Sequence, residues 1–282
     1  MLQVTFYGVR GSTPCSCDAT SGFGGNTSCV LVQAGEDDPI IFDCGTGLRY
    51  LGADLETEAD GGPIRATALV THLHWDHMQG LPFFGPILRD GAHLTLVGPA
   101  QDGESLEHEV AALIRPPFFP VALDDLPGRI DYVEMTASTR VVGSATVTAA
   151  DVPHIGPTNG YRVDCGNGSV AYLPDHQQPI DGSGTVTPEV LALCADVDIL
   201  VHDAQYDAVE FEAKATWGHS TPEFAAEVAL QAGAKRLVLF HHDPTHDDDW
   251  VQDAVVRTQR YVGDRLEVMA ANEGLVLTSG SP

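Results

Sequence analysis

The sequence predicts an α/β protein in which two sheets pack together and helices cover their outer sides, a four-layer αββα sandwich. Two observations predict this fold. Strand-like segments occur in two clusters along the chain, and segments with helical periodicity follow each cluster. Because every sheet and helix must bury an apolar face, two such units can stack as helix, sheet, sheet, helix. The 282 residues are interpreted as a single domain, 1–282.

The first cluster combines five predicted strands with two predicted helices. The strands lie at 2–8, 28–34, 39–43, 66–71 and 94–97, and the helices at 45–55 and 104–114. A Gly-rich turn at 22–25 suggests that the first strands pair antiparallel. Pro116, Pro117 and Pro120 break the second helix, and the section after it could cover the mouth of an active site.

The second cluster begins with three strands and continues with alternating helices and strands. Its strands are predicted at 140–149, 160–164, 169–173, 197–202 and 236–240, followed by two short closing strands, and its helices at 187–195, 222–232 and 249–262. No repeat, low-complexity tract or linker separates the two clusters.

Composition narrows the functional class. No apolar run approaches the length needed to span a bilayer, and MLQVTFYGVR lacks the basic and apolar pattern of a signal peptide, so we expect a cytoplasmic protein without a membrane partner. The formal net charge of −26 would repel polyanions, which argues against extended nucleic acid as a partner. The oligomeric state stays open, with a homodimer as one option.

The six cysteines are scattered along the chain, and we interpret them as reduced and structural. Cys15 and Cys17 form the one close pair. A closed zinc site needs about four ligands, and no second pair accompanies them.

The segment Thr71-His72-Leu73-His74-Trp75-Asp76-His77 places three imidazoles and one carboxylate directly after a predicted strand. Isolated histidines are usually surface or hydrogen-bonded core residues, but three within six positions indicate a metal site. Imidazole and carboxylate suit zinc and similar divalent ions, and alternate side chains at a strand end point to one side. One loop could therefore serve two metal ions.

This segment resembles the loop signature His-x-His-x-Asp-His of the metallo-β-lactamase fold superfamily, and the resemblance extends over nearly the whole chain. Asp151-Val152-Pro153-His154, Tyr172-Leu173-Pro174-Asp175 and Leu237-Val238-Leu239-Phe240-His241 each end a predicted strand where the family places a further ligand. The resemblance implies two divalent ions, with zinc expected and manganese or iron as alternatives. It implies one ion held by His72, His74 and His154, a second held by Asp76, His77 and His241, and a bridging Asp175.

Two more segments resemble the phosphodiesterase branch of this superfamily, which includes the tRNA 3′-processing endonucleases. They are Leu200-Val201-His202-Asp203-Ala204 and Trp217-Gly218-His219-Ser220-Thr221. The resemblance implies that Asp203 orients His219, which then protonates the departing oxygen or binds phosphate. Aspartate at 203 departs from the glutamate that is common in that branch. The alternative is a hydrogen-bonded pair that only buttresses the site.

Other polar residues near these motifs have simpler interpretations. Asp76 is expected to be a metal ligand first and a proton acceptor second. His176, His242 and His246, with Asp243, could contact phosphate or support the ligands, but a solvated loop fits them equally well. The segments 8–12 and 24–28 resemble the start of the same branch, and we interpret their Gly, Asn and Ser residues as turns.

The leading hypothesis is a dinuclear metal-dependent phosphodiesterase that acts on a small or cyclic phosphodiester through a water or hydroxide bridging the ions. A tRNA 3′-processing endonuclease is the nearest rival, but the chain has no long Gly/Pro-rich arm of the kind that grips RNA. A lactone, thioester or β-lactam hydrolase is weaker, because true β-lactamases of this fold commonly carry cysteine where Asp175 stands. A non-catalytic metal sensor is the remaining alternative. Histidine at position 74, where di-iron relatives carry glutamate, favours hydrolysis over redox chemistry.

Overall fold

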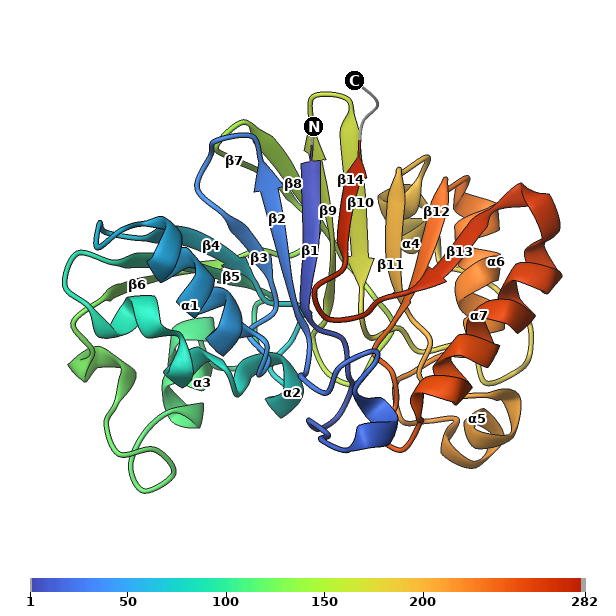
Figure 1. Ribbon diagram of the computed structural model, residues 1–282, viewed down its shortest axis with the longest axis horizontal. Helices are drawn as coiled ribbons and strands as arrows, with labels where there is room; N and C mark the ends of the chain where they lie inside the picture. Colours follow the sequence, from blue (N-terminus) through green and yellow to red (C-terminus); the bar gives the residue numbers. More distant parts are fainter. Residues whose placement is uncertain (1, 280–282) are drawn as a thin grey trace.

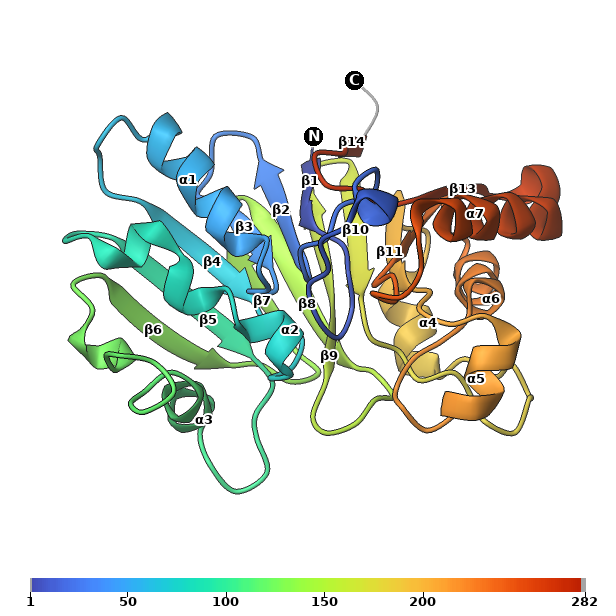
Figure 2. The ribbon, with the colours of Figure 1, turned by 60° about the horizontal axis from the view of Figure 1, so that its bottom comes forward.

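Two seven-stranded sheets pack face to face, and helices cover the outer side of each sheet (Figure 1). The structure, a computed structural model, describes residues 2–279. Turning the molecule shows helices α1 and α3 on one side and α4, α6 and α7 on the other, with both sheets between them (Figure 2). The predicted four-layer αββα sandwich is therefore confirmed.

The first sheet contains the N-terminal strands and one strand from the far end of the chain. In spatial order it consists of β14 (Val276–Ser279), β1 (Leu2–Gly8), β2 (Cys29–Ala34), β3 (Ile40–Phe42), β4 (Arg65–Leu69), β5 (His93–Gly98) and β6 (Arg129–Glu134). The strands from β14 to β3 pair antiparallel, as expected for the start of the chain, and those from β3 to β6 pair parallel. Outside this sheet lie α1 (Leu48–Glu58) and α3 (Leu106–Leu113).

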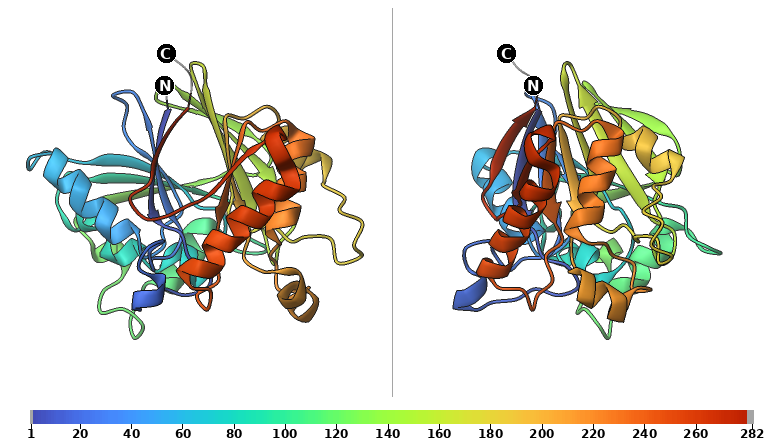
Figure 3. Two further views of the ribbon diagram at one scale, coloured as in Figure 1. Left: turned by 45° about the vertical axis from the view of Figure 1, so that its right-hand side comes forward. Right: turned by 90° about the vertical axis from the view of Figure 1, so that its right-hand side faces the viewer.

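The second sheet has the same mixture of pairings. Its order is β13 (Glu267–Ala270), β12 (Arg236–Phe240), β11 (Ile199–Asp203), β10 (Gly168–Leu173), β9 (Asn159–Cys165), β8 (Ala145–Asp151) and β7 (Thr139–Val142). Strands β10 to β13 are parallel, and β7 to β10 are antiparallel. Its outer face carries α4 (Pro188–Cys194), α6 (Pro222–Ala232) and α7 (Asp248–Val262), which Figure 3 shows from the side.

The main core lies between the sheets, where both contribute fully buried side chains. Phe42 of β3 stacks on Tyr172 of β10 with ring centroids 4.6 Å apart, and the Tyr161 hydroxyl of β9 donates a hydrogen bond to the Val70 carbonyl oxygen at 2.8 Å. Burying a side chain of this size contributes about 1.5–3 kcal/mol. These contacts hold the two sheets in a fixed relation, so residues at their adjacent edges can form one site.

The parallel strands determine where that site lies. Strands β3, β4, β10, β11 and β12 all run in the direction that brings their carboxyl ends to one edge of the sandwich, the edge where ligands bind in open α/β sheets. The residues that follow these ends include His72, Asp175 and His241. Helix α2 (Trp75–Met78), a single turn, continues the segment after β4.

Besides the single turn of α2, which was not predicted, the structure differs from the predicted elements in three places. Residues 140–149, expected as one strand, form the β7–β8 hairpin, which turns at Gly143 with φ +56°. Strand β6 was missed, because its side chains are half-buried at a sheet edge and its apolar pattern is weak. Helix α5 (Ala208–Lys214) was also missed, since it buries none of its side chains.

Within residues 2–279, no helix is both long enough and apolar enough to cross a bilayer.

Candidate metal centre

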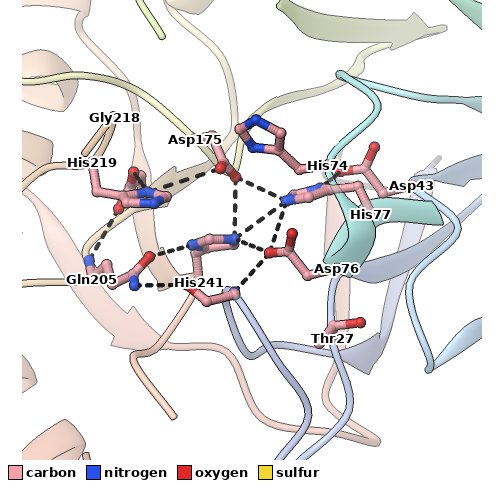
Figure 4. Close-up of polar contacts among 12 residues, drawn as sticks. Thr27, Asp43, His74, Asp76, His77, Asp175, Gln205, Gly218, His219 and His241 are labelled. Carbon is pink, nitrogen blue, oxygen red and sulfur yellow. Dashed lines mark hydrogen bonds and ion pairs between the residues drawn. The ribbon is translucent and has the colours of Figure 1, made fainter. Parts of the chain in front are cut away.

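The side chains predicted to bind metal come from both sheets and converge at the shared edge of the sandwich. Figure 4 shows five of them, His74, Asp76, His77, Asp175 and His241. His72 and His74 follow β4, and Asp76 and His77 lie in α2, which begins after His74. The second sheet contributes a histidine after β8, a carboxylate after β10 and a histidine after β12, namely His154, Asp175 and His241.

Among the described residues, three groups have ligand atoms that all lie within 4.8 Å of one another; two consist of these side chains alone, and a third joins Asp175 and His241 to His219. The first group contains His72, His74, His154 and Asp175, and the second contains Asp76, His77 and His241.

The carboxylate of Asp175 lies between the two groups. Its Oδ2 is 3.6 Å from His72 Nε2 and 3.5 Å from His154 Nε2. Its Oδ1 is 3.1 Å from His77 Nε2 and 3.2 Å from His241 Nε2. Each oxygen of this carboxylate therefore faces a different set of imidazoles, as the predicted bridging role requires.

Buried polar atoms without partners indicate that this cluster fits bound cations. His72 Nε2 and Asp175 Oδ1 are both buried and have no hydrogen-bond partner, and the contacts of Oδ1 with the imidazoles lack hydrogen-bond geometry. Such an atom costs about 1–3 kcal/mol when it stays unsatisfied. Both are the atoms that a divalent ion would contact, and imidazole with carboxylate is a donor set that suits zinc.

Further contacts fix the orientation of the imidazoles. His77 Nδ1 donates to Asp43 Oδ2 at 2.8 Å, His154 Nδ1 donates to the Gly218 carbonyl oxygen at 2.7 Å, and His241 Nδ1 donates to Gln205 Oε1 at 2.8 Å. In each case the bond at Nδ1 leaves Nε2 as the nitrogen that faces the centre. Partners of this kind set the tautomer and the direction of a metal-binding histidine.

Electrostatics differ between the two groups. Burial lowers the pKa of His72, His74 and His154, so these imidazoles are neutral at neutral pH, the form that binds a metal. Burial acts against protonation of His77 as well, but nearby carboxylates, led by Asp76, hold its pKa well above the usual range. A cation that enters the second group must therefore displace a proton.

Asp203 and His219 form a hydrogen-bonded pair beside the bridging carboxylate. His219 Nδ1 donates to Asp203 Oδ2 at 3.0 Å and lies 3.8 Å from Asp175 Oδ2. Asp203 is fully buried and also accepts hydrogen bonds from the backbone N–H groups of His176 and Gln205. Burial opposes the charged form of His219, but the Asp203 carboxylate raises its pKa above the usual value.

A pocket of about 340 Å³ opens onto residues of both metal groups and onto His219, while Asp203 lies buried behind it. Its lining includes two carboxylates and two imidazoles of the site together with two aromatic residues: Asp76, Asp175, His74, His219, Tyr206 and Trp217. A volume of this order is typical of sites for small molecules. The arrangement can therefore hold a small anionic group against two cations with an imidazole beside it.

Residues 39–242 match the family model described as the beta-lactamase superfamily domain. This span is well over half of the chain and contains every residue of the two metal groups. The chain belongs to the metallo-β-lactamase superfamily. It is accordingly a metal-dependent hydrolase with a His/Asp metal centre.

Curated members of the superfamily that resemble the chain include ribonucleases. A ribonuclease Z of Mycobacterium sp. (strain KMS) is 30% identical, and the alignment covers 98% of each chain. Ribonuclease BN of Cronobacter sakazakii is 28% identical over 92% of this chain and 94% of its own.

Solved structures share the fold at lower identity. YhfI from Bacillus subtilis has a TM-score of 0.74 at 19% identity, with 99% of both chains covered. A diphosphatase from the PhnP family has a TM-score of 0.71 at 19% identity, with 99% of this chain and 98% of that chain covered. Zinc-bound PqqB from Methylobacterium extorquens has a TM-score of 0.70 at 18% identity, with 98% and 99% covered.

The metallo-β-lactamase fold brings together all seven side chains for which the sequence predicted a metal-binding role, and it adds Asp203 and His219 next to them. Their individual roles stay predictions. The pair at Cys15 and Cys17 belongs to neither metal group, and all six cysteines are unpaired.

Three supporting residues were not identified from the sequence. Asp43, Gln205 and Ser12 contact metal-group side chains; the Ser12 backbone N–H donates to Asp76 Oδ2 at 2.7 Å. The segment 8–12 was interpreted as a turn, and Ser12 shows that it also contacts the site. The resemblance of this segment to the phosphodiesterase branch was the one signal that pointed to it.

The solvated loop suggested for three other histidines is wrong, because His176, His242 and His246 are all buried. His176 Nδ1 lies 2.9 Å from His202 Nε2, and His242 Nε2 donates to the Ala271 carbonyl oxygen at 3.0 Å. His246 pairs with Glu210 at 2.9 Å. All three lie outside the two metal groups. The section after α3, which was expected to cover the mouth of the site, packs against the 3₁₀ helix Leu81–Phe83, with the ring centroids of Phe119 and Phe83 5.8 Å apart. The lining of the metal-site pocket comes from other segments.

Proposed function

We propose that the chain is a dinuclear phosphodiesterase that acts on a small or cyclic phosphodiester, with zinc as its metal. The observation that carries the proposal is His219, which is hydrogen-bonded to the buried Asp203, lies beside Asp175 and lines the same pocket as residues of both metal groups. Hydrolysis of a diester needs a nucleophile on one side of phosphorus and a proton for the oxygen that departs. The metal groups support formation of the nucleophile, and the Asp203–His219 pair supports delivery of the proton to the departing oxygen.

The proposed roles follow from the contacts. His72, His74 and His154 would hold one cation, Asp76, His77 and His241 the other, and Asp175 would bridge them. Two such cations supply activation of water and neutralisation of phosphate charge. Asp76, whose pKa His77 and His241 hold well below the usual range despite burial, is ionised, which favours its role as a metal ligand over that of a proton acceptor.

His219 would protonate the departing oxygen. Its Nδ1 is bonded to Asp203, which leaves Nε2 as the nitrogen available to a substrate. The carboxylate raises the pKa of the imidazole, so a larger fraction carries the proton that the leaving group needs. Although Asp203 is shorter than the glutamate expected from the branch, it reaches His219 at 3.0 Å.

The size of the pocket and the charge of the chain favour a small substrate. Binding of RNA depends on cationic contacts with many phosphates, and a net charge of −26 opposes them. A diphosphatase from the PhnP family shares the fold, which is in keeping with a small phosphate compound as substrate. RNA 3′-processing is the second candidate, because the curated relatives are named ribonucleases.

A substrate panel tests this proposal. Protein purified and loaded with Zn²⁺ is offered a 2′,3′-cyclic nucleotide, bis(p-nitrophenyl) phosphate, precursor tRNA and a lactone. We expect hydrolysis of the two small diesters. Cleavage of the tRNA alone, or of the lactone alone, would overturn the proposal.

Two variants separate metal binding from proton transfer. Asp76→Ala should lose bound metal, whereas His219→Ala should keep it and lose roughly 10²- to 10⁴-fold in kcat, the usual contribution of a positioned acid. His93→Ala is the matched control, because His93 pairs with Asp131 in the first sheet and lies outside the pocket. An unchanged rate in His219→Ala would remove His219 from the mechanism.

A further inference from the structure

Two large apolar side chains remain exposed where they line the metal-site pocket. Trp217 is 59% exposed and Ile155 is 52% exposed, although both are part of the pocket wall beside His219 and Asp175. Scattered exposed apolar residues are ordinary, but an exposed indole in the wall of a pocket gives a ligand a large surface for contact. The phosphodiester chemistry uses neither side chain.

The backbone around these two residues is firmly held. The Trp217 backbone N–H donates to the Lys214 carbonyl oxygen at 2.9 Å, and the Gly218 N–H donates to Gln177 Oε1 at 2.8 Å. The Gly218 carbonyl oxygen accepts the 2.7 Å hydrogen bond from His154, and Ile155 follows His154 directly. Trp217 and Ile155 are thus each one residue from a contact that orients a metal-group imidazole, so their positions relative to the metal groups are fixed.

The second aromatic residue of the pocket is engaged by the protein itself. The Lys214 ammonium lies 4.3 Å from the centroid of the Tyr206 ring, and the edge of the His219 ring meets Tyr206 at 5.5 Å and 87°. The same ammonium is 5.8 Å from the Trp217 ring. Trp217 therefore offers the aromatic surface in the pocket that is most open to a ligand.

We propose that Trp217, with Ile155 beside it, binds a nucleobase by stacking, so that the substrate is a nucleoside phosphodiester. The inference rests on the proposed function for the position of the phosphate and adds the chemistry of the group attached to it. A planar base suits an open indole, and stacking accepts every base because each has a π-face. Thr216 and Ser12 also line the pocket and provide hydroxyl groups for the polar edge of a base or for the ribose.

Binding of AMP and ribose 5-phosphate, measured by calorimetry on the zinc-loaded protein, tests the inference without turnover. The two ligands differ in the base, and both carry a phosphate for the metal centre. Trp217→Ala should weaken AMP binding roughly 5- to 100-fold, the range found for loss of one stacked base, and leave ribose 5-phosphate binding unchanged. Trp217→Phe should restore most of the loss, since phenylalanine keeps an aromatic face.

Tyr261→Ala is the control. Tyr261 is an exposed aromatic residue on α7, outside the pocket, and its removal should change neither affinity. Equal weakening of both ligands in Trp217→Ala, or unchanged AMP binding, would overturn the inference.

Hydrolysis of a 2′,3′-cyclic nucleotide and of glycerol 1,2-cyclic phosphate separates this inference from the proposed function. Trp217→Ala should lower kcat/KM for the nucleotide by the same factor as for AMP binding and spare the ester that lacks a base. If Trp217→Ala changes kcat/KM for both esters by the same factor, the base-binding role of Trp217 is rejected and the phosphodiesterase proposal is kept. If neither ester is hydrolysed but AMP binding still depends on Trp217, the base-binding role is supported and the phosphodiesterase proposal is rejected.

Discussion

The pairing of Asp203 with His219 predicts a change in the pH dependence of catalysis. Burial lowers the pKa of His219, but the carboxylates of Asp203, Asp175 and Asp76, led by Asp203, together raise it by more, so the net shift is upward. Asp203→Asn removes the negative charge, and the pKa of His219 should fall. An acid must be protonated to act, so the alkaline limb of the kcat–pH profile should move to lower pH. An unmoved limb with normal metal content would mean that the pair only buttresses the site.

Gln205 joins two metal-group residues that lie far apart in the sequence. Its Oε1 accepts from His241 Nδ1, and its Nε2 donates to the hydroxyl of Ser12, whose backbone N–H binds Asp76. Gln205→Ala should therefore weaken metal binding at the second group about 10- to 100-fold, as is usual for partners of metal-binding histidines. Titration with Zn²⁺ under a competing chelator measures this affinity. Gln33→Ala serves as the control, because Gln33 lies in β2 and donates to the Gly35 carbonyl oxygen away from the site; equal affinities in the two variants would contradict the role.

The residues that could be predicted are those that form a local pattern. His72, His74, Asp76 and His77 occur within six positions, which makes them visible without a structure. Gln205 is a single residue of a common type, and its role depends on a contact across 36 positions. Asp43 reaches His77 across 34 positions in the same way. Supporting contacts of this kind depend on how the sheets pack, and the sequence alone carries no short-range sign of them.

The turn between α5 and α6 depends on a glycine at 218. Gly218 has φ +98°, and a Cβ there would lie 2.4 Å from His154 Cε1. Gly218→Ala should lower the free energy of unfolding by more than the roughly 1–3 kcal/mol of backbone strain alone, and it should also displace a metal-group imidazole.

Gly184→Ala separates these two effects, because Gly184 has φ +60° and open space around it. In Gly184→Ala the free energy of unfolding should fall by the backbone strain alone, and the affinity for zinc should stay normal. Urea unfolding and zinc titration of both variants provide the comparison, and identical results would show that the contact with His154 has no effect.

At the level of elements, the sequence predicted strands and helices with a strong apolar pattern and missed those without one. The buried strands β10, β11 and β12 lie where they were expected. Helix α5 depends instead on its cap: Asp207 accepts hydrogen bonds from the N–H groups of Val209 and Glu210. Capping residues are common in turns as well, so this signal did not distinguish a short surface helix from a loop.

The metal centre joins the two halves of the molecule. His72 and His77 come after β4 of the first sheet, whereas Asp175 and His241 come after β10 and β12 of the second. A ligand that binds the folded chain alone stabilises it, by about 2.7 kcal/mol at 100 times its Kd. Zinc should therefore raise the denaturation midpoint of the chelator-treated protein, and added chelator should reverse the gain. Asp175→Ala should abolish most of this effect. A midpoint that is insensitive to zinc would contradict a shared site.

Strand β14 completes the first sheet by pairing with β1, with Val4 opposite Leu277. During translation, β14 emerges after the thirteen strands that precede it in the described chain. Until then β1 has an unpaired edge, and the nascent protein presents a strand that could pair with another chain. Residues near the end of the described chain therefore cover the edge formed by residues near its beginning, and ribosome-bound intermediates that lack β14 leave that edge open to pairing with another chain.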